Sequence, residues 1–336
     1  MNLQRAIATA ACALGVALSP MAAQAAPTYS AIYAFGDSLS DAGNLFGYTN
    51  GSLPAAPYYQ GEFSNGPNWI QDLSAGLGLA PLMPSLAPGG TDYAWGGATT
   101  AYAGTASTSV PNLTQQVGLF AQTLTVPAPS SALYTVWIGA NDLFGILGGS
   151  SCPTTGLLCT AGAAQSEADA IALLASIGAR NFLVPLLPDL GLTPGVAANG
   201  PLAAAAGTAL SKAYNQALLA DLAGLAGTSG MNLRFLDTFS LMDSAVADPA
   251  AFGLANVTAP CYVGPYTGGG SVCSDPSQYL FWDQVHPTAA GAALVAQAAL
   301  RALPEPGTLA IVALGLAGLA ASRRRRAAPA AASCCA

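Results

Sequence analysis

Short apolar runs alternate with long helix-like stretches over most of this chain, and this alternation constrains the fold more than any other feature. We expect strands at residues 31–35, 133–138, 181–186 and 232–236, and helices at 161–177, 201–225 and 288–302. Strands that alternate with helices form a parallel sheet covered on both faces, because right-handed crossovers place the helices there. The sequence therefore predicts an α/β fold, a three-layer α/β/α sandwich built on a parallel sheet.

The first apolar run leads into a serine, Ser38, within the sequence AFGDSLSDAGN at residues 34–44. Gly36 and the polar residues after it end the strand, and in an α/β fold active sites form at such strand ends. A serine in that position needs only a neighbouring base to become a nucleophile. The alternative is an ordinary strand-to-helix turn in which Ser38 or Ser40 caps a helix.

The candidate base is His286, the only histidine of the chain, and Asp283 precedes it by three residues. Histidine is the usual general base near neutral pH. At this spacing one turn can carry both groups, with the Asp283 carboxylate on Nδ1 and with Nε2 facing the nucleophile. The alternatives are a surface or core histidine, and an aspartate that caps the helix starting near Pro287.

Four short blocks in a fixed order resemble the GDSL or SGNH hydrolases, and the resemblance covers most of residues 31–302. The blocks are GDSL (36–39), YAWGGATT (93–100), GAND (139–142) and the segment from Asp283 to His286. Each block is weak by itself, but their order makes the match specific. Two residues depart from the family pattern: Asp92 stands where an asparagine often opens the second block, and Glu62 replaces a basic residue in a GRFSNG-like segment.

The resemblance implies a flavodoxin-like sandwich and an acyl-enzyme mechanism on Ser38, with His286 and Asp283 and without a metal or cofactor. It also implies an oxyanion hole formed by the backbone N–H groups of Ser38 and Gly97 and by the amide of Asn141, because negative charge grows on the ester oxygen. A glycine at position 97 would let the backbone approach the substrate closely. The alternatives are a turn glycine and a helix cap or turn asparagine.

The rival serine-hydrolase fold would show a G-x-S-x-G motif at its nucleophile. That motif does not occur in this sequence. The absence favours the GDSL interpretation of Ser38.

Four of the seven cysteines lie in two close pairs, Cys152 with Cys159 and Cys261 with Cys273. We interpret them as local disulfides formed in an oxidising compartment, although four cysteines allow three pairings. The second pair closes a loop just before Asp283 and would hold the base-bearing segment in place, the alternative being a contribution to stability alone. Zinc is not expected, because the spacings do not match its usual ligand patterns.

Both ends of the chain carry targeting patterns. Residues 1–25 predict a secretory signal peptide with a basic start, an apolar middle and an Ala-Gln-Ala cleavage site. Residues 304–326 combine Pro-Glu-Pro, an apolar run and four arginines, and resemble a PEP-CTERM sorting signal, which implies an exosortase-type processing enzyme as partner. The alternative is a membrane anchor, and either way the arginines would stay cytoplasmic. The hydrolase domain is then 26–303, and 327–336 is a short tail.

The net charge of the chain excludes polyanionic partners. Without its two ends the chain keeps four of nine basic and fifteen of sixteen acidic residues, a net charge of about −11. Such a domain repels nucleic acid and anionic membrane surfaces.

These patterns together predict an exported hydrolase of small-molecule or lipid carboxylic esters. We expect it in the periplasm, at the cell surface or outside the cell, with transient inner-membrane anchoring by the C-terminal segment. One alternative substrate is the O-acetyl group of an extracellular polysaccharide. An alternative from another class is a matrix or binding protein that keeps the fold without turnover.

Overall fold

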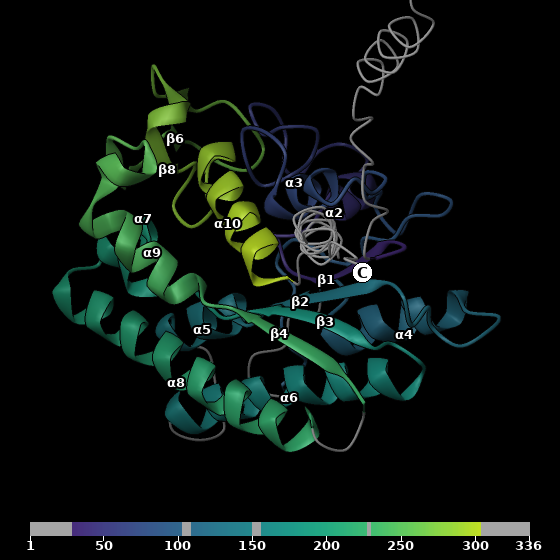
Figure 1. Cartoon of the computed structure of the whole chain (residues 1–336). Coiled ribbons are helices and arrows are strands. Elements are labelled where there is room, and N and C mark those ends of the chain that lie inside the picture. The colour runs from purple at the N-terminus through teal and green to yellow at the C-terminus, as the bar shows by residue number, and fades with distance from the viewer. Residues whose placement is uncertain (1–28, 103–108, 150–155, 227–229, 304–336) are drawn as a thin grey trace, which may run out of the picture. The chain divides into compact units, whose positions relative to one another are not determined.

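The computed structural model describes residues 29–102, 109–149, 156–226 and 230–303 (Figure 1). The predicted signal peptide, the sorting segment 304–326, the tail 327–336 and Cys152 lie outside the described residues. Within the described ranges, no helix has the length and apolar character needed to cross a membrane.

A parallel four-stranded sheet forms the centre of the domain, in the order β1-β2-β3-β4. Ala34 pairs with Thr135, which in turn pairs with Leu183, so the strand centres are in register. The four strands lie where the sequence predicts them. The first three bury consecutive side chains because the sheet is covered on both faces, whereas the fourth, at the edge, is largely exposed. The strands are β1 (Ile32–Gly36), β2 (Leu133–Trp137), β3 (Asn181–Pro185) and β4 (Asn232–Leu236).

A later segment of the chain lies along the outer side of β1. The N–H of Ala34 donates to the carbonyl of Thr91 (3.0 Å), and the N–H of Tyr93 donates back to the carbonyl of Ala34 (2.7 Å). Ala34 and Asp92 form a parallel bridge. The chain therefore places β2 on one side of β1 and residues 91–93 on the other. In open α/β sheets, ligands bind at the carboxyl ends of the strands where the strand order reverses in this way.

Helices cover both faces of this sheet, which confirms the predicted three-layer α/β/α sandwich (Figure 1). On one face α3 (Trp69–Gly76) packs against α10 (Ala289–Ala302). On the other face α6 packs along α8. That layer contains α4 (Leu113–Thr123), α5 (Ala140–Leu147), α6 (Gly156–Ser176) and α8 (Pro201–Ala226).

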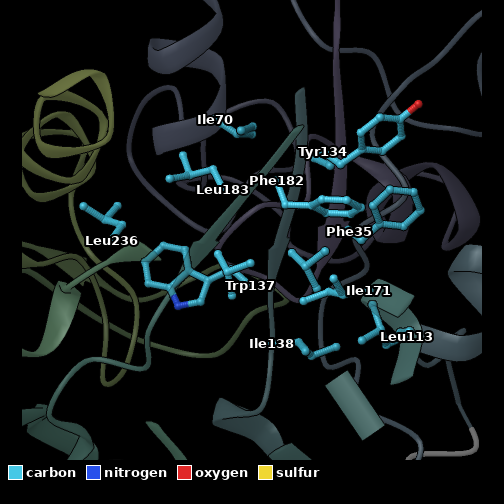
Figure 2. Packing of buried hydrophobic residues seen from close by; sticks show 14 of the residues in the cluster. Phe35, Ile70, Leu113, Tyr134, Trp137, Ile138, Ile171, Phe182, Leu183 and Leu236 are labelled. Carbon is cyan, nitrogen blue, oxygen red and sulfur yellow. The ribbon is translucent and has the colours of Figure 1, made fainter. Parts of the chain in front are cut away.

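The hydrophobic core fills the space between the sheet and the two helical layers (Figure 2). Phe35, Tyr134 and Phe182 come from three adjacent strands and are fully buried, and the Tyr134 and Phe182 rings lie 5.7 Å apart. Ile70 of α3 and Ile171 of α6 are equally buried. Burial of this much apolar surface stabilises the strand ends that position the site.

The chain after β4 builds the rest of the site from shorter elements that the sequence pattern does not predict. Among them, β8 leads directly to Asp283, and α9 follows β4 directly. The new elements are α9 (Thr238–Ala247), the parallel pair β5 (Asn256–Pro260) and β8 (Tyr279–Phe281), and the antiparallel ribbon β6 (Tyr262–Val263) and β7 (Ser271–Val272). Elsewhere the short helices are α2 (Asn44–Tyr48) and α7 (Pro194–Ala197), with 3-10 turns at Leu190–Leu192, Pro249–Phe252 and Pro276–Gln278.

Candidate active site

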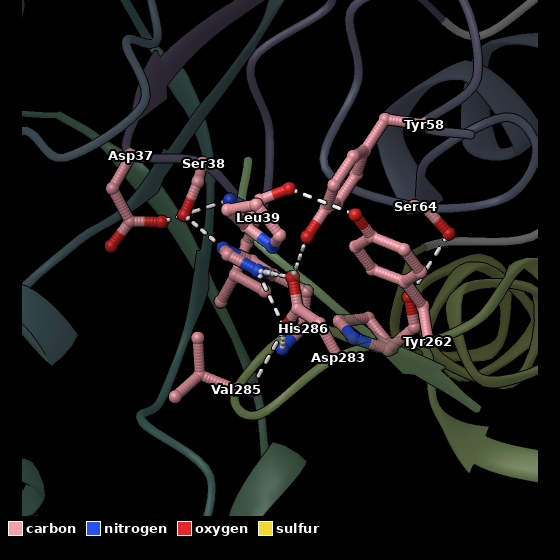
Figure 3. A network of polar contacts seen from close by, with 11 residues as sticks. Asp37, Ser38, Leu39, Tyr58, Ser64, Tyr262, Asp283, Val285 and His286 are labelled. Carbon is pink, nitrogen blue, oxygen red and sulfur yellow. Dashed lines mark hydrogen bonds and ion pairs between the residues drawn. The ribbon is translucent and has the colours of Figure 1, made fainter. Parts of the chain in front are cut away.

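Ser38, His286 and Asp283 lie in hydrogen-bond contact at the carboxyl end of β1 (Figure 3). The Nε2 atom of His286 is 2.7 Å from the Oγ atom of Ser38. Its Nδ1 atom is 2.8 and 2.9 Å from the two carboxylate oxygens of Asp283. The three side chains predicted from distant parts of the sequence therefore form one connected chain, with the geometry of nucleophile, base and orienting acid.

The Asp283 carboxylate is buried but well supplied with donors. Its Oδ1 accepts the N–H groups of Val285 (2.9 Å) and His286 (2.8 Å), and its Oδ2 accepts the hydroxyl of Tyr58 (2.7 Å). Burial by itself would raise the pKa of Asp283, but the His286 ring and these donors outweigh it and hold the pKa below its usual value. Asp283 is therefore an anion that can orient an imidazole and stabilise its charged form.

The turn that carries Ser38 is set by the residues on either side of it. The Asp37 carboxylate accepts the N–H of Leu39 (3.0 Å), and burial raises the pKa of Asp37 to about 7. Gly36 has a φ of +155°, and a Cβ there would lie 2.3 Å from the carbonyl oxygen of Trp137. Only glycine allows β1 to run this close to β2 immediately before the nucleophile.

Two buried aspartates tie the nucleophile turn to the YAWGGATT segment. Asp41 accepts the N–H of Gly96 (2.7 Å) together with N–H groups of its own turn, and Asp92 accepts the N–H of Ala42 (2.6 Å). Burial raises the pKa of Asp41 to about 6 and that of Asp92 well above its usual value. Asp92, the departure from the family pattern, is thus a hydrogen-bonded part of this link. Asp41 is a structural residue of the site that the sequence did not single out.

The predicted oxyanion donors line the same cavity as Ser38 and His286. Gly97 has a φ of +79°, which favours glycine, and a Cβ there would meet nothing within 4 Å, so this position borders the open space of the cavity. Asn141 lies in the first turn of α5, directly after β2, and one amide hydrogen donates to the carbonyl of Ala98 (2.8 Å). That bond orients the amide and leaves its second hydrogen available to a ligand.

Aromatic side chains surround the base. The rings of Phe63 and Tyr266 lie 5.0 and 6.0 Å from the His286 ring, and both line the cavity. Tyr58, the donor to Asp283, packs against Trp282 and against Tyr262. Both Tyr58 and Phe63 come from the loop-rich segment 57–69, which contains the GRFSNG-like stretch with Glu62. No sequence signal marks Tyr58, whose role depends on a contact with a residue 225 positions away.

The second predicted disulfide, between Cys261 and Cys273, is present and closes the β6–β7 ribbon. The first pairing stays a prediction, because Cys152 lies outside the described residues. Glu62, the other departure from the family pattern, is buried and accepts the N–H of Asn68 (2.7 Å), and burial raises its pKa to about 7. Among the described residues, no group of histidine, cysteine and acidic side chains is arranged to hold a metal ion.

Comparison with known families agrees with this geometry. Residues 32–299 match the model of the GDSL-like lipase/acylhydrolases. The chain belongs to this GDSL-like family. Residues 302–326 match the PEP-CTERM protein-sorting motif, which is an export and sorting signal. Both resemblances noted in the sequence are thereby confirmed.

Named relatives of this GDSL-like chain act on esters or lipids. It is 31% identical over 301 residues to a phosphatidylcholine-sterol acyltransferase of Aeromonas hydrophila, covering 85% of this chain and 83% of that protein. It is 32% identical over 326 residues to esterase EstA of Pseudomonas aeruginosa, covering 87% of this chain but 49% of EstA. The chain thus spans about half the length of some of the curated relatives that it matches.

A solved lipolytic protein of the G-D-S-L family from Veillonella parvula is similar over 81% of this chain and 96% of that one. Its sequence identity to this chain is 13% and the TM-score is 0.43. A likeness at this level supports no conclusion about the site.

Proposed function

We propose that this GDSL-like protein hydrolyses carboxylic esters through an acyl-enzyme on Ser38. The observation that carries the proposal is the contact of 2.7 Å between His286 Nε2 and Ser38 Oγ, with Asp283 on the opposite nitrogen of the ring. A base within hydrogen-bond reach of a hydroxyl, itself held by a third group, is the arrangement that activates a serine. A binding protein without turnover would not need this alignment.

In the first half of the reaction, Ser38 Oγ attacks the ester carbonyl while its proton passes to His286 Nε2. The carbonyl oxygen becomes an oxyanion, and the N–H groups of Ser38 and Gly97 and the amide of Asn141 are the donors that we assign to it. His286 then gives the proton to the alcohol oxygen as the carbon–oxygen bond to the leaving alcohol breaks. An ester between the acyl group and Ser38 remains.

In the second half, a water molecule takes the place of the alcohol. His286 removes one of its protons as the water oxygen attacks the acyl carbon, and the proton then returns to Ser38 Oγ as the acyl–serine bond breaks. Throughout, the Asp283 carboxylate stays ionised and stabilises the protonated ring, which the lowered pKa of Asp283 supports. The products are a carboxylic acid and an alcohol.

We further propose that the protein works outside the cytoplasm. The PEP-CTERM motif supports export and removal of the C-terminal segment by an exosortase-type enzyme, and the disulfide between Cys261 and Cys273 fits an oxidising compartment. The periplasm, the cell surface and the medium all satisfy these conditions. The same motif favours one second candidate, the removal of O-acetyl groups from an extracellular polysaccharide.

The test is the Ser38→Ala variant, measured for labelling by a fluorophosphonate probe and for turnover of p-nitrophenyl esters. We expect the variant to lose labelling and at least about 10⁴-fold in kcat, because the nucleophile is gone and only binding contributions remain. Ser176→Ala is the matched control, since Ser176 is exposed at the end of α6. Turnover that survives in the folded Ser38→Ala protein would rule out the mechanism.

A further inference from the structure

The cavity that contains Ser38 extends between two helices that take no part in the proposed chemistry. Its volume is about 340 Å³, at the small end of the ~300–1,000 Å³ range of ligand pockets. Helix α9 lines it with Thr238, Leu241, Met242 and Ala245, and helix α10 lines it with Gly291, Leu294 and Val295. Positions three and four residues apart lie on one face of a helix, so each helix turns a continuous face to the cavity.

These two faces are apolar. Leu241 and Met242 are only half-buried although they lie on the cavity, so an empty cavity leaves them in contact with water. The hydroxyl of Thr238 donates to the carbonyl of Leu186, and that of Thr193, another lining residue, donates to the carbonyl of Leu190 (2.7 Å). Both hydroxyls are therefore already bonded to the backbone.

A small hydrophobic cluster joins the two helices beside the cavity. Leu280 and Phe281 of β8 belong to this cluster and also line the cavity. Met242 of α9 and Leu294 of α10 pack against the same cluster. The cavity thus has two parts. One contains polar side chains that can meet a reacting ester, those of Ser38, Asn141 and His286. The other lies between the apolar faces of α9 and α10, and we call it the chamber.

We infer that this chamber binds the acyl chain of the substrate and selects medium-length chains. The inference rests on the proposed acyl-enzyme mechanism at Ser38. The lining face of α9 runs from Thr238 to Ala245, which at 1.5 Å per residue is about 10 Å. A fully extended chain advances about 1.2 Å per bond, because a residue of three backbone bonds spans ~3.3–3.6 Å. The chamber therefore fits an acyl chain of about six to ten carbons.

This assignment separates the two candidate substrates. An acetyl group would place a single methyl group in the cavity and leave the apolar faces of α9 and α10 wet. Each added methylene that leaves water should raise kcat/KM by up to about fourfold, until the chamber is full. The chamber therefore favours fatty acyl esters over O-acetylated polysaccharide.

Ala245 is the residue that we expect to set the chain length. It lies on the last turn of α9, at the far end of the lining face from Thr238, and is 1% exposed. In Ala245→Leu the larger side chain would occupy the chamber, whereas Met242→Ala would enlarge it. Ala247→Leu is the matched control, because Ala247 is exposed on the same helix and does not line the cavity.

The experiment measures kcat/KM for p-nitrophenyl esters from acetyl to decanoyl, with the leaving group held constant. We expect wild type to prefer octanoyl over acetyl by at least about tenfold, and Ala245→Leu to lower that ratio about tenfold or more. Met242→Ala should shift the optimum to longer chains, and Ala247→Leu should match wild type. If Ala245→Leu does not fold, the direction of the Met242→Ala shift decides.

Three outcomes overturn the inference without touching the proposed function. One is Ser38-dependent turnover that is fastest on acetyl esters. A second is a chain-length profile that none of the chamber variants changes. The third concerns the leaving group. A parallel series of acetate esters with lengthening alcohols tests whether the chamber binds the alcohol part of the ester. A preference for long alcohols in this series would assign the chamber to the leaving group instead of the acyl chain. Turnover that does not depend on Ser38 would mean that the proposed function itself has failed.

Discussion

The Tyr58 hydroxyl does more for this site than fill space in a loop. It donates to Asp283 Oδ2 at 2.7 Å, and its side chain is 5% exposed. Burial, together with the adjacent Asp283 charge, raises the pKa of Tyr58 well above its usual value, so the hydroxyl keeps its proton. Tyr58 is thus a permanent donor that holds the carboxylate in the orientation facing His286.

We expect Tyr58→Phe to lower kcat about tenfold, since a hydrogen bond to a charged group contributes ~1.5–3 kcal/mol. Without this donor the pKa of Asp283 rises, so its carboxylate is neutralised at higher pH and no longer supports the His286 ring. The acidic limb of the kcat/KM profile should therefore move to higher pH. Tyr59→Phe is the control, because the Tyr59 hydroxyl has no hydrogen bond to any of the residues that the structure describes. A Tyr58→Phe profile that overlays wild type would show that Tyr58 is only packing.

The β6–β7 ribbon is the element that supports the base-bearing segment. Its residues Cys261 and Tyr262 donate their N–H groups to the carbonyls of Phe281 (3.0 Å) and Trp282 (2.6 Å), directly before Asp283. The Tyr262 and Trp282 rings stack at 5.5 Å. The disulfide from Cys261 to Cys273 closes the ribbon, and Cys261 is itself hydrogen-bonded to Phe281, so the covalent link is tied directly to the segment that carries Asp283 and His286.

Replacing both Cys261 and Cys273 by serine should therefore affect more than stability. The loss of a crosslink over a short loop costs about 3 kcal/mol, and each kcal/mol lowers Tm by roughly 2–4 °C in a domain of this size. We also expect a several-fold lower kcat at temperatures far below the new Tm, measured beside wild type with and without reductant. A kcat equal to that of wild type, together with a reduced Tm, would mean that the disulfide serves stability alone.

The sequence predicts the long elements of this fold well and the short ones poorly. The strand at 181–185 coincides with an apolar run, because an inner strand of a parallel sheet buries nearly every residue in turn, whereas the edge strand at 232–236 is predicted by its place between two helices and is largely exposed. Helix α9 escapes prediction, because its ten residues are fewer than the roughly 11–18 over which an apolar period is read, and its apolar face borders a cavity. The Ser38, Asp283 and His286 contact follows from motif order, whereas Tyr58 is placed by tertiary structure only.

At the scale of the whole domain, buried carboxyl groups make stability depend on pH. Burial raises the pKa of Asp37 and Glu62 to about 7 and that of Asp41 to about 6. Since the folded form binds these protons more tightly than the unfolded chain, this contribution is complete below pH ~4 and is lost as pH rises through 6 to 7. Asp283 acts in the opposite sense, because its lowered pKa adds stability that is lost only in stronger acid.

We therefore expect Tm to be highest near pH 5 and to fall by several degrees towards pH 8, as measured by thermal unfolding across that range. Glu62→Gln should flatten part of this slope, because glutamine has no proton to lose. Asp169→Asn, at an exposed position of α6, should leave the slope unchanged. A Tm that climbs steadily to pH 8 would contradict the expectation.

The segment beside β1 also affects how copies of this protein meet one another. A bare edge strand invites a second chain to add to the sheet, which is a common start of aggregation. Here Thr91 and Tyr93 already occupy the outward backbone groups of Ala34, and the opposite edge strand, β4, carries the exposed, charged Arg234. Charge on an edge strand discourages such pairing. In the compartment that we propose, beyond the reach of cytoplasmic chaperones, copies of this protein therefore have little tendency to join sheet to sheet even at high local concentration.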